Sequence, residues 1–310
     1  MSKFKYGPLL AAALFAGSVL PATAADTYTK TKYPLLMVHG LFGFEKLGGV
    51  VDYFYGIPGA LRSGGATVYF SDESMVNSNE VRGEQLIERM ETLQALYGHE
   101  KFNLIGHSQG SGVARYAASV RPDLVASWTG FDYAHSGNRV ADLVTTLLPE
   151  GSPLRPLVAS FVEAIVAFVD NGAPEDAVGA VTSMDTPGAA RFTAKYPEGK
   201  PTQFCGQAPS ARAANGVYYY SFSGTGVFTN VLDPFDYSST AGGALYAFFG
   251  EQSDGLVSRC PSHWGQVIRD DYNWNHFDAI NQVLGLRSWF SSDPEAVYRS
   301  QANRLKNAGL

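Results

Sequence analysis

Short apolar runs alternate with amphipathic segments along most of the chain. Apolar runs of about four to eight residues, bounded by glycine or proline, are typical of buried strands. Such runs occupy residues 33–38, 66–70, 102–105, 124–128 and 218–223. Helical patterns separate several of them, and strands alternating with helices favour a mostly parallel sheet covered by helices on both faces. The pattern therefore predicts an α/β fold.

Two helical segments flank the run at 102–105. Residues 80–97 carry large apolar side chains on one face and charges opposite, and Gly98 would end this helix. The apolar face comprises Leu86, Met90, Leu93 and Tyr97. A second helix is expected over 109–120, directly after the strand. Because no internal repeat or linker-like stretch interrupts the pattern, we expect residues 26–310 to form one domain.

Residues 1–25 have the pattern of a secretory signal peptide. Lys3 and Lys5 precede an apolar run over 9–20, and small residues at 21–25 supply the cleavage site. The alternative, a membrane anchor, is disfavoured because the run is shorter than the ~20 residues that a bilayer requires. No later segment resembles a transmembrane helix, so we expect an exported protein without a membrane span in its mature chain.

Composition narrows the function classes. The chain has 310 residues, 45% of them hydrophobic and 17% charged, which excludes a disordered or collagen-like protein. Its net charge is −6, and without a basic stripe it is not expected to bind nucleic acid. Because an exported compartment is oxidising, the two cysteines, Cys205 and Cys260, are expected to form one disulfide. The alternative is a pair of unbonded buried thiols.

A G-x-S-x-G motif surrounds Ser108. Gly106 and Gly110 flank this serine at the junction between the expected strand 102–105 and the helix over 109–120. A strained strand-to-helix turn needs small residues on both sides so that the serine hydroxyl projects clear of the sheet. The motif alone is weak, but this context predicts a nucleophilic serine.

A neutral serine needs a base to remove its proton and an acid to orient that base. In this arrangement the partners follow in the order serine, acid, histidine. His276, on an irregular stretch before a helical pattern at 279–284, is favoured as the base over His263, which is interpreted as structural or surface. Asp254 is favoured as the acid, and the alternatives are Asp233 and Asp236.

Two backbone N–H groups are expected to form an oxyanion hole. One belongs to Gln109, the residue after the nucleophile, and the other to the loop after the first strand, where Leu41 is the candidate. Because the donors are backbone groups, the identity of these side chains matters little to the hydrogen bonds.

The sequence as a whole resembles the Pseudomonas-type, foldase-dependent subfamily of bacterial triacylglycerol lipases, whose members have the α/β-hydrolase fold. The similarity covers nearly all of residues 26–310. It is carried by TYTKTKYP at 27–34, VDYFYGIP at 51–58, EVRGEQL at 80–86, NLIGHSQGSG at 103–112, VRPDL at 120–124, VIRDDY at 267–272 and ANRLKNAGL at the C-terminus. The resemblance implies a catalytic triad of Ser108, Asp254 and His276, a Cys205–Cys260 bridge and hydrolysis of long-chain acylglycerols.

The resemblance also implies a structural Ca²⁺ ion. The matching positions are Asp233 and Asp278 through carboxylates and Gln282 and Leu286 through backbone carbonyls. All-oxygen ligation suits calcium. Members of this family commonly need a membrane-anchored foldase and leave the periplasm by type II secretion, so an extracellular location is expected.

The chain departs from the family pattern in three places. Leu41 stands where methionine is usual, Gln109 where histidine is frequent, and residues 133–138 replace the common APHKGS.

Residues 154–169 are apolar over most of their helical circumference. Such a segment is more often a core helix. Its place in a long insertion, together with the resemblance, instead predicts a helical lid over about 150–172 and activation at a lipid–water interface. The alternatives are a short-chain carboxylesterase without interfacial activation and a non-catalytic binding protein of the hydrolase fold.

Overall fold

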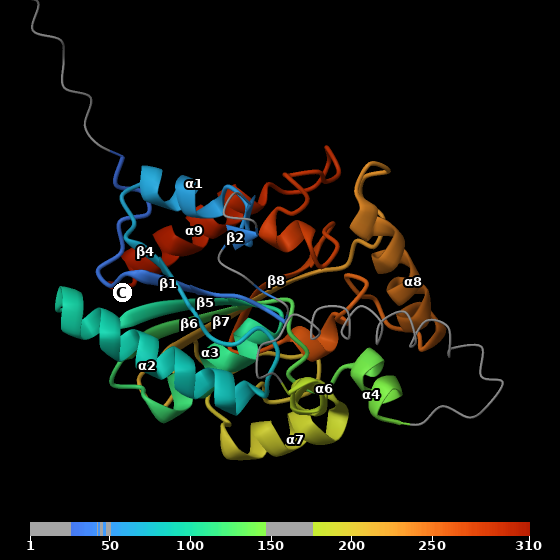
Figure 1. Ribbon diagram of the computed structural model, residues 1–310, viewed down its shortest axis with the longest axis horizontal. Helices are drawn as coiled ribbons and strands as arrows, with labels where there is room; N and C mark the ends of the chain where they lie inside the picture. Colours follow the sequence, from blue (N-terminus) through green and yellow to red (C-terminus); the bar gives the residue numbers. More distant parts are fainter. Residues whose placement is uncertain (1–25, 42, 44–45, 48–50, 147–175) are drawn as a thin grey trace, which may run out of the picture.

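A parallel β-sheet forms the centre of the molecule (Figure 1). The computed structural model describes residues 26–41, 43, 46–47, 51–146 and 176–310. The predicted signal peptide and lid lie outside the described residues. Every neighbouring pair in the sheet is parallel. The strand order is β4 (Val68–Phe70), β1 (Leu35–Val38), β5 (Phe102–His107), β6 (Val125–Phe131), β7 (Tyr218–Gly224) and β8 (Gln266–Tyr272). A separate antiparallel pair consists of β2 (Lys46–Leu47) and β3 (Val51–Asp52).

The apolar runs found in the sequence correspond to β1, β4, β5, β6 and β7, so the predicted parallel sheet is confirmed. β6 continues to Phe131, three residues beyond its expected end. β8 was not expected from the apolar pattern because it lies at the sheet edge and carries consecutive charges, Arg269, Asp270 and Asp271. Most residues of β8 are at least partly exposed, so this strand lacks a continuous apolar run.

Helices cover both faces of the sheet, as expected (Figure 1). Their bounds are α1 (Ile57–Ser63), α2 (Asn79–Tyr97), α3 (Gln109–Val120), α4 (Arg139–Thr145), α6 (Ala177–Met184), α7 (Thr186–Lys195), α8 (Pro234–Phe248) and α9 (Pro294–Asn307), with 3₁₀ turns η1 (Cys260–Ser262) and η2 (Asp278–Ile280). Leu35 and Met37 of β1 pack in the cluster of α1 and α9, whereas Leu36 and Val38 pack with α2 and α3. This two-residue alternation divides the core into two layers.

α2 matches its predicted bounds closely. The Ser78 side chain caps its first turn by accepting a hydrogen bond from Val81 N, and Gly98 ends it with φ 72°. Leu86, Met90 and Leu93 are buried as predicted. Tyr97, which was placed on the same apolar face, is exposed, so the prediction was wrong for this residue. The helix ends at Tyr97, and the Tyr97 ring stacks on Tyr69 near the surface.

The helical pattern expected at 279–284 forms only the short turn η2. Asn281 and Leu284 adopt left-handed backbone angles, with φ 61° and 54°, which an α-helix cannot accommodate. Side-chain amides hold the segment instead, because Asn281 donates to Tyr55 O and Gln282 donates to the Asp52 and Tyr53 carbonyls. Tertiary hydrogen bonds therefore override the local periodicity.

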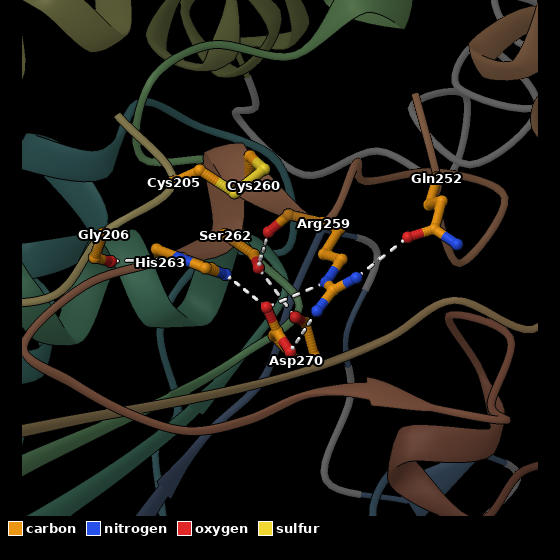
Figure 2. Close-up of a disulfide and its surroundings, with 9 residues drawn as sticks. Cys205, Gly206, Gln252, Arg259, Cys260, Ser262, His263 and Asp270 are labelled. Atoms are coloured by element: carbon orange, nitrogen blue, oxygen red, sulfur yellow. Dashed lines mark hydrogen bonds and ion pairs between the residues drawn. A yellow bond between two sulfur atoms is a disulfide. The ribbon is translucent and has the colours of Figure 1, made fainter. Parts of the chain in front are cut away.

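Cys205 and Cys260 form the expected disulfide, so the alternative of two free thiols is wrong. Figure 2 shows the bond joining the segment before β7 to η1. Beside it, the imidazole of His263 lies 2.8 Å from a carboxylate oxygen of Asp270 and 3.0 Å from Gly206 O. His263 is thus buried and structural rather than a surface residue.

Within the part of the chain that the structure describes, no helix is both long and apolar enough to cross a membrane.

Candidate active site

Ser108 occupies a sharp turn between β5 and α3. Its φ of 52° is unusual for a residue with a side chain, and its N–H donates to Phe131 O at 2.8 Å. The flanking glycines are sterically required: a Cβ on Gly106 would lie 2.5 Å from Gly110 O, and one on Gly110 would collide with Val38 O. The predicted strand–serine–helix context is therefore present, with strain concentrated at the serine.

His276 and Asp254 meet on loops at the carboxyl end of the sheet. His276 follows β8, and its Nδ1 donates to Asp254 Oδ2 at 2.7 Å. The other carboxylate oxygen of Asp254 accepts the N–H groups of Leu256 and Val257, at 2.8 and 2.6 Å. Both side chains of the pair are buried. With the proton on Nδ1, Nε2 of His276 remains available as a base.

The rival residues have other partners. The Asp233 side chain caps α8 by accepting from Phe235 N, and Asp236 accepts from the backbone of Thr229 and Asn230. His263 pairs with Asp270, as described above. The structure therefore brings together Asp254 and His276 and places the rivals elsewhere.

A chain of hydrogen bonds ties three loops together beside Ser108. The His107 ring lies 4.7 Å from that of His276, centroid to centroid, and its Nε2 donates to His276 O at 2.9 Å. Its Nδ1 accepts from the Tyr53 hydroxyl at 2.8 Å, and this hydroxyl accepts from Gly40 N at 3.1 Å. Burial, and then the proximity of His276, hold the pKa of His107 well below its usual value. His107 is consequently neutral, as accepting at Nδ1 requires.

The predicted oxyanion donors lie on both sides of the serine. Gln109 is the first residue of α3, where a backbone N–H has no acceptor within the helix. The loop after β1 approaches from the other side, since a Cβ on Gly40 would lie 2.8 Å from Ser108 Cβ. Leu41 is the next residue of this loop.

Arg82 links the end of β1 to the start of α3. Its guanidinium donates to His39 O at 2.8 Å and to the Gln109 side chain at 2.7 Å, and it pairs with Glu73 at 3.1 Å. Arg82 is fully buried. In the sequence, Arg82 stood out only as part of the segment EVRGEQL. A charged residue among the apolar positions of the helix was the available signal.

Asp132 is a further buried carboxyl, which the sequence analysis did not single out. It directly follows β6, and its Oδ1 accepts from Gly224 N at 2.8 Å. Burial, followed by interaction with Asp254, raises its pKa well above the usual range. Because the strand was expected to end at residue 128, the position of Asp132 at the carboxyl end of the sheet was not recognised.

The expected calcium ligands show the features of a cation site. One oxygen each of Asp233 and Asp278, Oδ2 and Oδ1 respectively, is buried without a hydrogen-bond partner. Burial, together with the charges of Asp236 and Asp233, raises the pKa of Asp278 to about 7. Among the described residues no group of three or more His, Cys, Asp or Glu side chains could hold a metal, so this donor set would need carbonyl oxygens as well. The orphaned carboxylate oxygens fit a calcium ion.

A serine at the turn between β5 and α3, with an Asp–His pair on loops at the carboxyl edge of a parallel sheet, is typical of the α/β-hydrolase fold. The alpha/beta hydrolase fold family matches residues 33–144. The Staphylococcus hyicus lipase structure is similar, with a TM-score of 0.61 and 17% identity over 93% of this chain and 99% of that one. A Bacillus licheniformis lipase has a TM-score of 0.59 and 18% identity over 81% and 87% of the two chains. These likenesses confirm the predicted fold.

Closer sequence relatives are named triacylglycerol lipases. The Vibrio cholerae protein is 46% identical, over 97% of this chain and 98% of its own. The Burkholderia plantarii protein is 38% identical, over 98% and 94%, and the Pseudomonas fragi protein 36% identical, over 92% and 100%. The chain belongs to this family of bacterial triacylglycerol lipases. This result confirms the family resemblance seen in the sequence, and it confirms the prediction that the protein is an enzyme.

Proposed function

We propose that this enzyme hydrolyses the carboxylic ester bonds of triacylglycerols through Ser108, His276 and Asp254. The observation that carries the proposal is the 2.7 Å hydrogen bond from His276 Nδ1 to Asp254, on a loop tied to the turn that holds Ser108. Family membership supplies the substrate class, since the relatives are named triacylglycerol lipases.

The geometry supports acyl transfer in two steps. His276 Nε2 takes the proton of Ser108 Oγ as this oxygen attacks the ester carbonyl, and the Asp254 carboxylate stabilises the imidazolium. The N–H groups of Leu41 and Gln109 would bind the oxyanion. Collapse of the intermediate releases the alcohol, which receives its proton from His276, and leaves an acyl-enzyme. Water, deprotonated by His276, then releases the fatty acid.

Hydrolysis of emulsified triolein tests this function, with short soluble esters assayed in parallel. Enzyme pretreated with a fluorophosphonate provides the background. We expect triolein cleavage that the pretreatment abolishes. Cleavage of short esters alone would instead indicate a carboxylesterase, and failure of the fluorophosphonate to label Ser108 would indicate a binding protein.

Secretion and activation at an interface are further parts of the proposal. Residues 1–25 support export, and the apolar character of residues 154–169 supports a lid. Exposing five large apolar side chains to water would cost roughly 8–15 kcal/mol, so uncovering them should require a lipid surface. A foldase partner and type II secretion are proposed from family membership.

A calcium ion would be held by the carboxylates of Asp233 and Asp278 and by the backbone carbonyls of Gln282 and Leu286. When bound, it would neutralise the buried carboxylates and fix the loop on which His276 lies, two residues before Asp278. This role is structural: the chemistry belongs to the triad.

Calcium removal is expected to lower the thermal midpoint, increasingly so as the pH rises. Because the pKa of Asp278 in the folded chain is raised to about 7, the folded state binds this proton more tightly than the unfolded state. The resulting stability is present near pH 4 and is lost as the pH rises toward 7. Thermal melts in EDTA should therefore shift downward across this range, and added calcium should restore the midpoint at about pH 8.

Asp278→Asn provides the control for this experiment. It should flatten the pH dependence measured in EDTA and weaken the response to calcium, because the titrating ligand is gone. Identical melting curves with EDTA and with calcium at about pH 8 would contradict the proposed site.

A further inference from the structure

We propose that the Tyr53 hydroxyl and the His107 imidazole act as a positioning pair, which aligns the loop after β1 with the loop that carries His276. The pair thereby sets the N–H groups that bind the oxyanion and the base that deprotonates Ser108 in one fixed arrangement. The inference rests on the proposed function, because it concerns the alignment of the proposed catalytic groups. It assigns a role to two side chains that take no chemical part in the hydrolytic steps.

The two ends of the hydrogen-bond chain fix the direction of every bond in it. The chain begins at Gly40 N, which can only donate, and ends at His276 O, which can only accept. His107 Nε2 must therefore carry a proton. Burial holds the pKa of His107 well below its usual value, so the ring is neutral and its Nδ1 accepts from the Tyr53 hydroxyl at 2.8 Å. All three bonds point the same way, an arrangement in which each bond polarises and strengthens the next.

The first end of the chain lies against the nucleophile. Gly40 immediately precedes Leu41, whose N–H is the expected oxyanion donor of this loop. Gly40 fits tightly between two groups: an added Cβ would lie 2.7 Å from the Tyr53 hydroxyl oxygen and 2.8 Å from Ser108 Cβ. The hydrogen bond from Gly40 N to Tyr53 thus determines how closely the oxyanion loop approaches Ser108.

The second end of the chain holds the main chain of the base. The carbonyl of His276 accepts from His107 Nε2 at 2.9 Å, and the N–H of His276 donates to Asp254 O at 3.0 Å. The same two residues are joined through their side chains, at 2.7 Å. Because the backbone of His276 is held on both sides, a change at His107 should displace the imidazole of His276 relative to Ser108.

The chain lies where water cannot replace a lost hydrogen bond. Tyr53 is 9% exposed, His107 1% and His276 4%. His107 is also the last residue of β5, so the ring is fixed to the central sheet directly before Ser108. A bond removed from this chain would leave a buried donor or acceptor unpaired, and the loops would shift to relieve it.

Two variants break the chain at different places. Tyr53→Phe keeps the ring and removes the hydroxyl, so the bonds to Gly40 N and to His107 are both lost. His107→Gln keeps a side-chain amide that can donate to His276 O but has no nitrogen acceptor facing Tyr53.

A second tyrosine–histidine contact provides the matched control. The Tyr69 hydroxyl lies 2.9 Å from His99 Nε2, beside the start of β5 rather than its carboxyl end. Tyr69→Phe therefore removes a comparable contact that does not touch the candidate site.

The first test measures kcat and KM for a short-chain ester below its solubility limit, at a temperature where circular dichroism shows each variant to be folded. Tyr53→Phe should lower kcat about tenfold at unchanged KM, because displaced groups slow the chemical step without weakening ground-state binding. Tyr69→Phe should keep nearly all of its kcat. Wild-type kcat in Tyr53→Phe would overturn the proposal, and so would an equal loss in Tyr69→Phe.

The second test asks whether the pair acts on the oxyanion donors. An alkyl boronic acid forms a tetrahedral adduct with a serine nucleophile, and its oxygen occupies the place of the oxyanion. Tyr53→Phe should raise the inhibition constant of this compound about tenfold while KM stays the same, since displaced donors bind the adduct less well than the planar ester. A merely structural role would not separate the two constants, and an unchanged inhibition constant would overturn the inference.

The third test asks whether the two side chains act as one unit. The double variant Tyr53→Phe/His107→Gln should lose no more kcat than the more impaired single variant, because each single change already interrupts the chain. Losses that multiply would indicate two independent effects and would contradict a shared role.

A spectroscopic test does not depend on any variant folding. Nitrogen NMR of the wild type at neutral pH should show His107 as the neutral tautomer with its proton on Nε2. A proton on Nδ1, with or without one on Nε2, would reverse the bond to Tyr53 and overturn the proposal. Fluorophosphonate labelling of wild-type Ser108 separates the two levels: without labelling the proposed function fails, whereas with labelling only the role of the Tyr53–His107 pair is in question.

Discussion

Replacing Ser108 with alanine is expected to lower kcat for ester hydrolysis by roughly 10⁶. The turn between β5 and α3 carries the Ser108 hydroxyl, and the adjacent His107 hydrogen-bonds to the backbone of His276. Alanine removes the attacking oxygen and must adopt the same positive φ as serine. The residual rate would come from substrate binding and the oxyanion donors alone. Initial rates on a soluble ester, normalised to the concentration of folded protein in the variant and the wild type, provide the measurement.

Ser111→Ala is the matched control for this variant. Ser111 is a buried serine of the same helix, and its hydroxyl donates to Phe131 O at 3.2 Å, away from the His276–Asp254 pair. The Ser111→Ala variant should still be labelled by the fluorophosphonate at Ser108 and should keep most of its activity. If Ser108→Ala retained appreciable, fluorophosphonate-sensitive activity, the nucleophile would have to be another residue.

Replacing Asp254 with asparagine is expected to lower kcat by about 10⁴. An asparagine amide facing His276 Nδ1 favours the tautomer with the proton on Nε2, which can no longer accept the serine proton. The amide would also fail to stabilise the imidazolium that forms during attack. The loss should appear in kcat with little change in KM, and labelling of Ser108 by the fluorophosphonate should slow in parallel.

The chain supplies its own control in a second Asp–His pair. His263 and Asp270 are joined by a contact of 2.8 Å, close to the 2.7 Å of the candidate pair, but next to the disulfide (Figure 2). Arg259 and His263 lower the pKa of Asp270 although burial opposes this shift, so Asp270→Asn should affect stability and leave kcat nearly unchanged. Equal losses of activity in the two variants would show that the histidine–aspartate contact at residue 254 has no special role.

Much of the architecture could be predicted from local sequence. The strands β1 and β5 are short apolar runs buried on both faces, so the sequence alone reveals them. α2 has both an apolar face and a terminal glycine, and its predicted bounds hold to within one residue. The edge strand β8 and the segment after Asp278 escaped prediction, because exposure of one side and hydrogen bonds to distant carbonyls replace periodicity there.

The candidate site, like the fold, could be predicted only in part from the sequence. Because the motif around Ser108 is contiguous, the sequence by itself determined the strand–serine–helix turn and the family to which the chain belongs. The sequence favoured Asp254 over Asp233 and Asp236, and the structure places Asp254 alone of the three against His276, while Asp233 caps α8 and Asp236 accepts bonds from the backbone before α8. Likewise, the link through His107 and Tyr53 and the hydrogen bonds of the buried Arg82 exist only once distant segments meet. The physical reason is that a periodic pattern reports which face of an element is buried, whereas hydrogen bonding and protonation depend on which atoms the folded chain places within about 3 Å of one another.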